Sequence, residues 1–233
     1  MDVRTLRAAR VKLGWTQQTS ARRLGVSQSY LSMLEAGARQ LTRRVATKMM
    51  RAYRLSSSVL PPTTEPWATS RPSADELVDE LAALGYPGFA YLRKHVPRKN
   101  PYQVVLEALA QPNLEARIVE ALPWLMVRHA EGDTQWLEDN AKLTDVQNRL
   151  GFVVTMARRL TESDPKRKAE ALALARLEER LYRSRLARED TLCRESLTGA
   201  ERRWLRTNRS EEARRWNLLT GWMPEHFRYA QDA

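Results

Sequence analysis

The 233-residue chain is long enough for one large or two small domains, and its single cysteine, Cys193, excludes an internal disulfide and a cysteine-based metal cluster. Its 39 Lys and Arg outnumber its 28 Asp and Glu, giving a net charge of +11. We expect a cytoplasmic protein that contacts no membrane, because the sequence holds no apolar signal core and no apolar run of the roughly 20 residues that cross a bilayer.

The excess positive charge is concentrated at the front of the chain. Residues 1–54 contain 12 Lys and Arg but 2 Asp and Glu, a balance of +10, whereas residues 55–233 contain 27 and 26, a balance of +1. Basic side chains gathered on one domain are typical of contacts to nucleic-acid phosphates. The front segment is therefore the part of the chain that we predict to bind nucleic acid.

The first amphipathic helix carries a charge on its apolar stripe. Val3, Leu6 and Leu13 form that stripe, and Arg10 shares it. A charge in this position needs a partner, because burying an unpaired ion is costly. Glu35 is the obvious candidate.

The next stretch predicts two short helices joined by a tight turn. The hydroxyls of Thr16 and Ser27 are suited to cap helices over 17–24 and 28–36. Gly25 lies between them, where a left-handed residue ends a helix and glycine adopts that conformation at least cost. Two short helices around such a turn form a helix-turn-helix, whose second helix enters the DNA major groove.

The second motif helix has an inward and an outward face. Leu31 and Leu34 point inward at i, i+3 spacing. The residues expected to point outward are Gln28, Ser29, Ser32 and Met33.

Three segments, Thr16-Gln17, Leu24-Gly25-Val26-Ser27 and Leu34-Glu35-Ala36-Gly37, resemble the motif of the XRE (Cro and phage-repressor-like) DNA-binding domain. The resemblance covers roughly the first 60 residues. It implies a five-helix, lambda-repressor-like domain over residues 1–60, with its last short helix at 56–60.

The same resemblance implies roles for individual residues. It pairs Arg10 with Glu35 as a structural ion pair, and it gives Gln17 the role of anchoring a phosphate at a helix N-terminus. Ser20 departs from the family, which usually has an apolar residue there, so we expect looser local packing.

The predicted DNA-binding residues divide by the part of DNA they would contact. Gln28 can pair bidentately with adenine, and Met33 can contact a thymine methyl group. Arg39 and Arg43 lie beyond the second motif helix, where a backbone contact and a solvated charge run are equally good readings. The full predicted set is Gln17, Gln28, Ser29, Tyr30, Ser32, Met33, Arg39 and Arg43.

A linker and a second helical domain follow. Four prolines without periodicity in residues 61–72 predict the linker, in which Trp67 is suited to dock on a domain. Residues 73–233 predict a larger all-α interaction or regulatory domain of stacked helical hairpins, with Pro123 breaking or bending one helix. Its helices are expected to begin at Ser73, Asn100-Pro101, Pro112-Asn113, Asp133, Thr144, Asp164-Pro165 (running at least to Arg188), Thr198 and Ser210.

The search for catalytic chemistry returns little. The histidines have no metal-ligand spacing, no glycine-rich phosphate loop occurs, and Cys193 stands in a polar stretch expected to be helical, with no histidine near it in sequence. Glu138, Asp139 and Asp145 are better explained as caps and a solvated face than as a metal site. We therefore predict no enzyme, no metal and no cofactor.

A basic loop in the second domain has two readings. Arg93, Lys94, His95, Arg98 and Lys99 follow Phe89, Tyr91 and Leu92. Basic residues beside aromatics can bind nucleic acid. An apolar plug with a solvated basic edge is the preferred reading, because residues 55–233 are nearly neutral.

These features favour a transcriptional regulator that binds double-stranded operator DNA as a homodimer and acts as a repressor. The alternative is an antitoxin that also represses its own operon, because residues 84–91 and 204–216 resemble regulators that accompany AbiEii-type nucleotidyltransferase toxins. A regulator that senses a small molecule is a third hypothesis, and it requires a pocket in the second domain.

Overall fold

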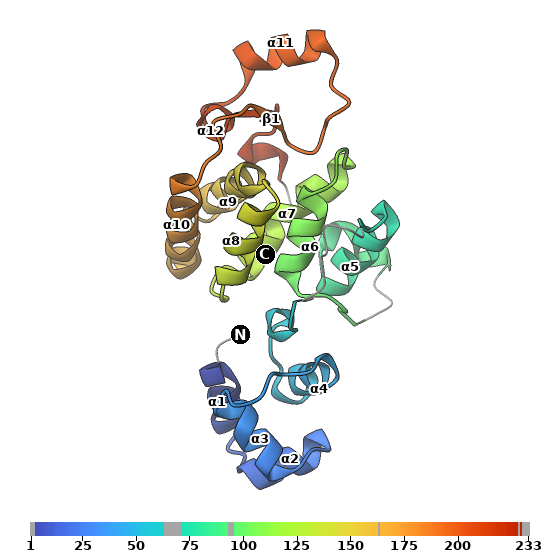
Figure 1. Ribbon diagram of the computed structural model, residues 1–233, viewed down its shortest axis with the longest axis vertical. Coiled ribbons are helices and arrows are strands. Elements are labelled where there is room, and N and C mark those ends of the chain that lie inside the picture. The colour runs from blue at the N-terminus through green and yellow to red at the C-terminus, as the bar shows by residue number, and fades with distance from the viewer. Residues whose placement is uncertain (1–2, 63–70, 93–95, 163, 228, 230–233) are drawn as a thin grey trace. The chain divides into compact units, whose positions relative to one another are not determined.

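The computed structural model describes every residue except 1–2, 63–70, 93–95, 163, 228 and 230–233. The chain divides into two compact units, Met1–Pro62 with Arg98–Asn100, and Thr63–Pro97 with Pro101–Ala233 (Figure 1). Most of the predicted linker, Trp67 included, lies outside the described residues. The same holds for Arg93, Lys94 and His95 of the predicted basic loop.

The first unit contains the two predicted motif helices. Thr16 Oγ1 accepts the backbone N–H of Thr19, and Ser27 Oγ accepts that of Tyr30, each at 3.1 Å. Gly25 ends the first motif helix with φ of +66°. The expected fifth helix is a single 3-10 turn, η1. The elements of this unit are α1 (Val3–Lys12), α2 (Gln17–Leu24), α3 (Gln28–Glu35), α4 (Arg43–Tyr53) and η1 (Ser57–Val59).

The core of the first unit is built from α1 to α4. Leu6, Leu24, Leu31, Leu34 and Met49 are all essentially inaccessible to solvent. The prediction that Leu13 joins this core is wrong. Helix α1 ends at Lys12, so Leu13 falls in the following turn and its side chain is 38% exposed. The side chain of Val3 lies outside the described part.

Ser20, the departure from the family pattern, is fully buried in this core. Its hydroxyl shares a hydrogen bond with the hydroxyl of Tyr53 on α4. Burial raises the pKa of Tyr53, because the phenolate would lose its hydration, although the bond from Ser20 acts in the other direction. A buried, hydrogen-bonded polar pair therefore stands where we expected looser packing.

The second unit is helical apart from two very short strands, which confirms the all-α fold class. Strands β1 (Asp190–Thr191) and β2 (Leu218–Leu219) pair in parallel, with Asp190 opposite Leu218. Its helices are α5 (Ala74–Leu84), η3 (Pro87–Leu92), α6 (Pro101–Leu109), α7 (Ala116–Arg128), α8 (Gln135–Leu143), α9 (Gln147–Glu162), η4 (Pro165–Arg167), α10 (Lys168–Arg183), α11 (Gly199–Asn208), α12 (Glu211–Arg215) and η5 (Pro224–His226).

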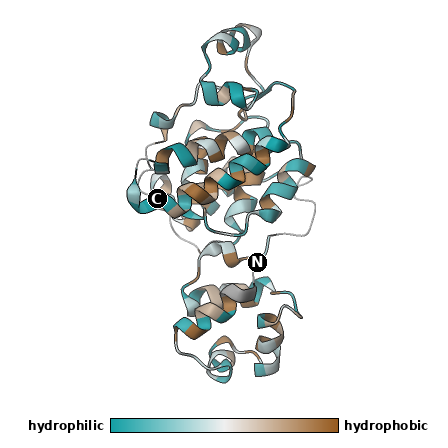
Figure 2. Ribbon diagram, turned by 90° about the vertical axis from the view of Figure 1, so that its left-hand side faces the viewer, coloured by the Kyte–Doolittle hydropathy of each residue, from teal (hydrophilic) through white to brown (hydrophobic). Residues whose placement is uncertain are grey.

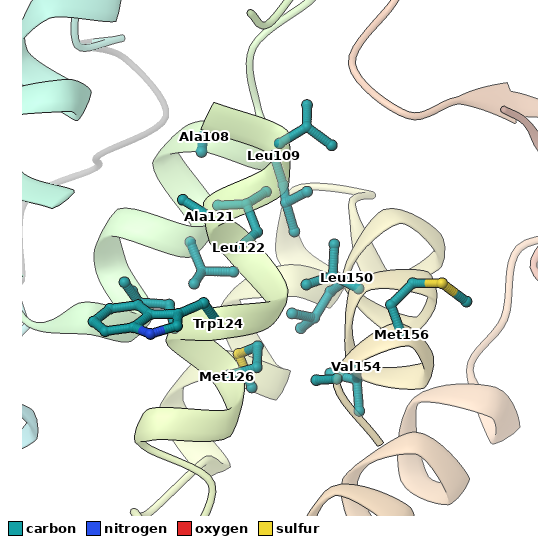
Figure 3. Packing of buried hydrophobic residues seen from close by; sticks show 14 of the residues in the cluster. Ala108, Leu109, Ala121, Leu122, Trp124, Met126, Leu150, Val154 and Met156 are labelled. Atoms are coloured by element: carbon teal, nitrogen blue, oxygen red, sulfur yellow. The ribbon is translucent and has the colours of Figure 1, made fainter. Parts of the chain in front are cut away.

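Helix α9 is the centre of the second unit. It packs against α10, α7, α6 and α8, and buried apolar side chains from these helices form one cluster. Figure 2 shows that hydrophobic residues are frequent on the helices of this unit. Figure 3 shows Leu122 and Met126 of α7 close to Leu150 and Val154 of α9. All four side chains are buried, so this contact forms the middle of the core.

A break of α7 at Pro123 and the predicted start of this helix are both wrong. The helix runs through Pro123 without a break, because Leu122 and Trp124 on either side of it are buried in the core and packing outweighs the one lost backbone hydrogen bond. The helix also begins at Ala116 rather than at Pro112-Asn113. Asn113 instead pairs with the C-terminal segment, where its side-chain oxygen accepts the N–H of Ser196 at 3.0 Å.

Two further helix boundaries differ from the prediction, and a polar side chain at the start of α9 explains where α10 ends. Helix α9 begins at Gln147 rather than directly after Thr144, and Thr144 instead ends α8. Helix α10 ends at Arg183, short of the predicted Arg188. Asn148 exchanges two hydrogen bonds of 2.9 Å with the backbone N–H and C=O of Leu186, which holds that segment in a non-helical path.

The predicted helical setting of Cys193 is also wrong. Cys193 follows β1, is buried, and has a φ of +51°. Beside it, Arg149 of α9 forms a bidentate ion pair with Asp190, at 2.7 and 2.9 Å, and donates to the carbonyl of Leu109 at 2.8 Å. Burial raises the pKa of the Cys193 thiol to about 12, so the neutral thiol persists at physiological pH.

Glu138 is not on a solvated face, as we expected, but is buried between two helices. It accepts hydrogen bonds of 2.6 Å from Lys142 of its own helix and from Arg180 of α10. Burial opposes its ionisation, yet these two cations outweigh that effect and hold the pKa of Glu138 below its usual value. The residue ties α8 to α10.

Gly151 of α9 gives a test of the core. A methyl group there would lie 2.2 Å from Cζ3 of Trp216, whose indole N–H donates to Thr155 at 2.8 Å. Gly151→Ala should therefore lower the free energy of unfolding by about 1–3 kcal/mol, measured by urea denaturation of the intact chain. Gly199→Ala is the matched control, because only the end of Arg203 lies nearby, at 3.5 Å. Equal effects of the two substitutions would contradict the packing described here.

Candidate nucleic-acid interface

Helix α3 presents the predicted contact residues to solvent. Gln28, Ser29 and Met33 are exposed, and Ser32 is half-buried. Tyr30 is half-buried because its ring packs against the core of the unit. On the opposite side Leu31 and Leu34 are buried, so the inward and outward faces lie as the i, i+3 spacing indicates.

Beneath this face, Arg10 and Glu35 form a bidentate ion pair. Arg10 Nε lies 2.6 Å from Glu35 Oε1, and Arg10 Nη2 lies 2.8 Å from Oε2. The remaining Arg10 nitrogen, Nη1, donates to the carbonyl of Trp15 at 2.8 Å. The two side chains are 10% and 3% exposed, so the pair joins α1 to the end of α3 inside the unit.

The ion pair continues toward the surface through two glutamines. Gln17 Nε2 donates to Glu35 Oε2 at 2.9 Å, and Gln17 Oε1 accepts from Gln28 Nε2 at 2.9 Å. We call the four side chains Arg10, Glu35, Gln17 and Gln28 the polar network. It fixes the amide of exposed Gln28 against groups whose own orientation is set by the core.

The hydrogen bonds of the polar network shift the pKa values of both Glu35 and Arg10. Burial opposes a charge on Glu35, but hydrogen bonds from Arg10 and Gln17 outweigh that cost and lower its pKa. The hydrogen bond to Glu35 correspondingly raises the pKa of Arg10. Both groups are therefore ionised at neutral pH, and the carboxylate acts only as a hydrogen-bond acceptor.

The surface of the first unit is strongly basic. Glu35 is the one carboxylate among its described residues, and Arg10 neutralises it. Arg39 is exposed, and Arg43 donates to the carbonyl of Arg98 within the same unit. The exposed Lys and Arg of the unit's helical part are Arg7, Lys12, Arg22, Arg23, Arg39, Arg43, Arg44, Lys48, Arg51 and Arg54.

Sequence reasoning did not foresee that Gln17 holds Gln28. The signal was present, because each glutamine directly follows a helix-capping hydroxyl residue, Thr16 or Ser27. Both glutamines therefore occupy the first turn of their helices. The angle at which the turn joins α2 to α3 decides whether the two amides meet, and a spacing of residues does not contain that angle.

The described residues hold no group of three or more His, Cys, Asp and Glu side chains placed to bind a metal ion. Within the same part of the chain, no helix has the length and apolar character needed to cross a membrane.

Comparison with known families matches residues 6–60 to the helix-turn-helix family. The matched range covers α1 to α4 and η1. No curated protein and no solved structure matches the chain. Together with the geometry above, the match supports an XRE-type helix-turn-helix DNA-binding domain over residues 6–60, of the kind found in transcriptional regulators.

The buried ion pair gives a double-mutant test. Arg10→Met or Glu35→Leu alone should cost about 3–5 kcal/mol, because each leaves an uncompensated buried charge. The double variant should cost less than the sum of the two single changes. Thermal unfolding of the intact chain measures all four proteins, and small, additive losses would show that the pair is not buried.

The lowered pKa of Glu35 makes the stability of the first unit depend on pH. Its folded pKa lies below the unfolded value of 4.5, so its contribution is complete above that pH and is lost as pH falls through the folded pKa. Residues 1–62 hold no other carboxyl side chain except that of Asp2. The protection factors of the α3 amides, which are exchange rates corrected for the intrinsic effect of pH, should therefore fall below pH 4.5, and Glu35→Gln should flatten this dependence. An equally steep acid profile in that variant would refute the assignment.

Proposed function

We propose that the chain is a sequence-specific transcriptional regulator that binds operator DNA as a homodimer through residues 1–60 and represses transcription. The observation that carries this proposal is the polar network, which holds the amide of Gln28 in a fixed position on the exposed face of α3. A fixed amide has less conformational entropy to lose when it binds a base, which favours selective contact.

The residues of the interface take separate roles in this proposal. Gln28 pairs with an adenine, Met33 contacts a thymine methyl group, and Ser29 and Ser32 reach neighbouring base edges. Gln17 donates to a phosphate at the N-terminus of α2, where the helix dipole also favours an anion. Tyr30, Arg39 and Arg43 contact the backbone, which positions the helix without reading sequence.

The distribution of charge supports a division of labour between the two units. Residues 1–54 carry a balance of +10, and residues 55–233 carry +1. Displacement of counterions from DNA by the first unit would make binding steeply dependent on salt. In this proposal residues 61–72 are the linker, and residues 73–233 are an all-helical domain for interaction or regulation. This proposed function requires neither a cofactor nor a catalytic residue.

Gln28 and Gln17 give the decisive test of the interface. Gln28→Ala should cost about 1–3 kcal/mol of binding at one base pair and relax selectivity there, because it removes a base contact. Gln17→Ala should weaken binding to every sequence, because it removes a phosphate contact that carries no sequence information, and it should relax selectivity at the Gln28 base pair less than Gln28→Ala does, because Gln28 then loses only its hydrogen bond to Gln17. Titrations against the operator and its single-base variants measure both effects.

Gln18→Ala is the matched control for these titrations. Gln18 is the exposed neighbour of Gln17 on α2, and no hydrogen bond joins it to the polar network. The Gln18→Ala substitution should leave the affinity for DNA unchanged. If Gln28→Ala weakened every operator variant by the same factor, Gln28 would be a backbone contact, and base reading would fall to Ser29 and Met33.

An antitoxin is the second candidate function. Two aromatic residues of the second unit, in the segments that resemble AbiEii-associated regulators, are exposed: Tyr91 is 70% accessible and Trp204 is 61% accessible. Exposed aromatic side chains are enriched at protein interfaces. A nucleotidyltransferase toxin encoded beside this gene, neutralised by the wild-type chain but not by Tyr91→Ser, would support this candidate. A gene without such a neighbour favours the regulator alone.

A further inference from the structure

The second unit contains a cavity of about 900 Å³, and Trp204 is the one lining residue that a role above uses. Its walls come from α7, the segment that follows β1, α11 and the C-terminal segment around η5. One wall is a small apolar cluster, separate from the main core, made of Leu197, Leu205 and Leu219. A volume of this size is in the range that holds a small organic ligand.

Aromatic side chains line much of the rest of the cavity. Trp204 of α11 is 61% exposed, and Tyr229 is also accessible. Trp222 is held in place by stacking on Phe227, with ring centroids 5.1 Å apart. Aromatic faces carry negative electrostatic potential, so a desolvated cation beside them is stabilised.

The two carboxylates at the cavity have no cationic partner among the residues that the structure describes. Glu120 of α7 and Glu225 of η5 both line it, and neither forms an ion pair with a described residue. Glu120 is near enough to Tyr86 to raise the pKa of that phenol, although burial is the larger cause. The cavity thus has two acidic groups available to a ligand.

The basic groups at the cavity do not offset this charge. The guanidinium of Arg194 pairs with Glu201 at 3.3 Å. Nδ1 of His226 accepts the backbone N–H of Met223 at 3.1 Å, so this nitrogen is occupied within the segment. The lining is therefore apolar and aromatic with an excess of negative charge, inside a domain whose overall balance is close to zero.

We propose that this cavity is a binding site for organic cations with a broad apolar body. The apolar cluster and the tryptophans take the body, and Glu120 and Glu225 stabilise the positive charge. Neither a neutral polar metabolite nor an anion matches this combination. The site stands on the second unit alone, so it holds or fails independently of the DNA-binding proposal.

Two ions of equal shape and opposite charge test the proposal on the full-length chain. Tetraphenylphosphonium should bind in calorimetric titrations in sodium buffer. Glu120→Gln and Glu225→Gln should each weaken it about two- to fivefold, which is the range of a partly exposed charge pair. Tetraphenylborate should respond in the opposite direction and bind the same variants more tightly. Adventitious binding of this anion to the basic first unit would not change with these substitutions.

Two further variants separate the cavity from the general surface. Trp204→Ala should weaken both ions, because it removes a shared apolar and aromatic wall. Glu179→Gln is the matched control, since Glu179 is an exposed carboxylate of α10, paired with Arg183, that does not line the cavity. Unchanged circular dichroism shows that each variant is folded. Failure of tetraphenylphosphonium to bind, or binding that is indifferent to Glu120 and Glu225, would overturn the assignment.

Discussion

The ion pair between Arg10 and Glu35 is the constraint on which the DNA-binding unit depends. The pair is almost fully buried, so the loss of either partner leaves the other charge unpaired among apolar side chains. The same carboxylate that neutralises Arg10 also orients Gln17, and Gln17 orients Gln28. In the proposed function, the stability of the unit and the recognition of bases therefore depend on the same carboxylate. This arrangement holds Gln28 on the exposed face of α3 through hydrogen bonds.

The second unit also depends on buried polar side chains, and there they help to attach the C-terminal segment to the helical core. Its C-terminal segment is attached to the helical core by buried apolar side chains, Trp216 among them, and also by polar side chains at the start of α9. Asn148 holds the backbone at Leu186, and Arg149 holds Asp190 and the end of α6. Each of these groups satisfies backbone or carboxylate partners that burial would otherwise leave unpaired. The resulting walls enclose the cavity beside α11.

The helices with capping residues were predictable, and the ends decided by tertiary contact were not. Ser73 and Thr198 each form the predicted capping box, since both partners lie within one turn. Pro123 misled the prediction because burial on both sides of it keeps the helix intact. At the candidate interface, the faces of α3 followed from spacing. The bond between Gln17 and Gln28 and the cavity near Trp204 depend on how distant segments meet, and a local pattern carries no such information.

The packing of Trp216 against Gly151 has a consequence for the order in which the chain is made. The core around α9 lacks its largest side chain until residue 216 has left the ribosome, whereas every helix of the helix-turn-helix is complete by residue 53. Domains generally fold as units during synthesis, the N-terminal one first. If a nonsense codon or a stalled ribosome ended synthesis early, the product would thus contain a folded first unit and an incomplete second unit. Such a fragment would compete with the full-length chain for the same DNA sites, but it would lack the function of the second unit.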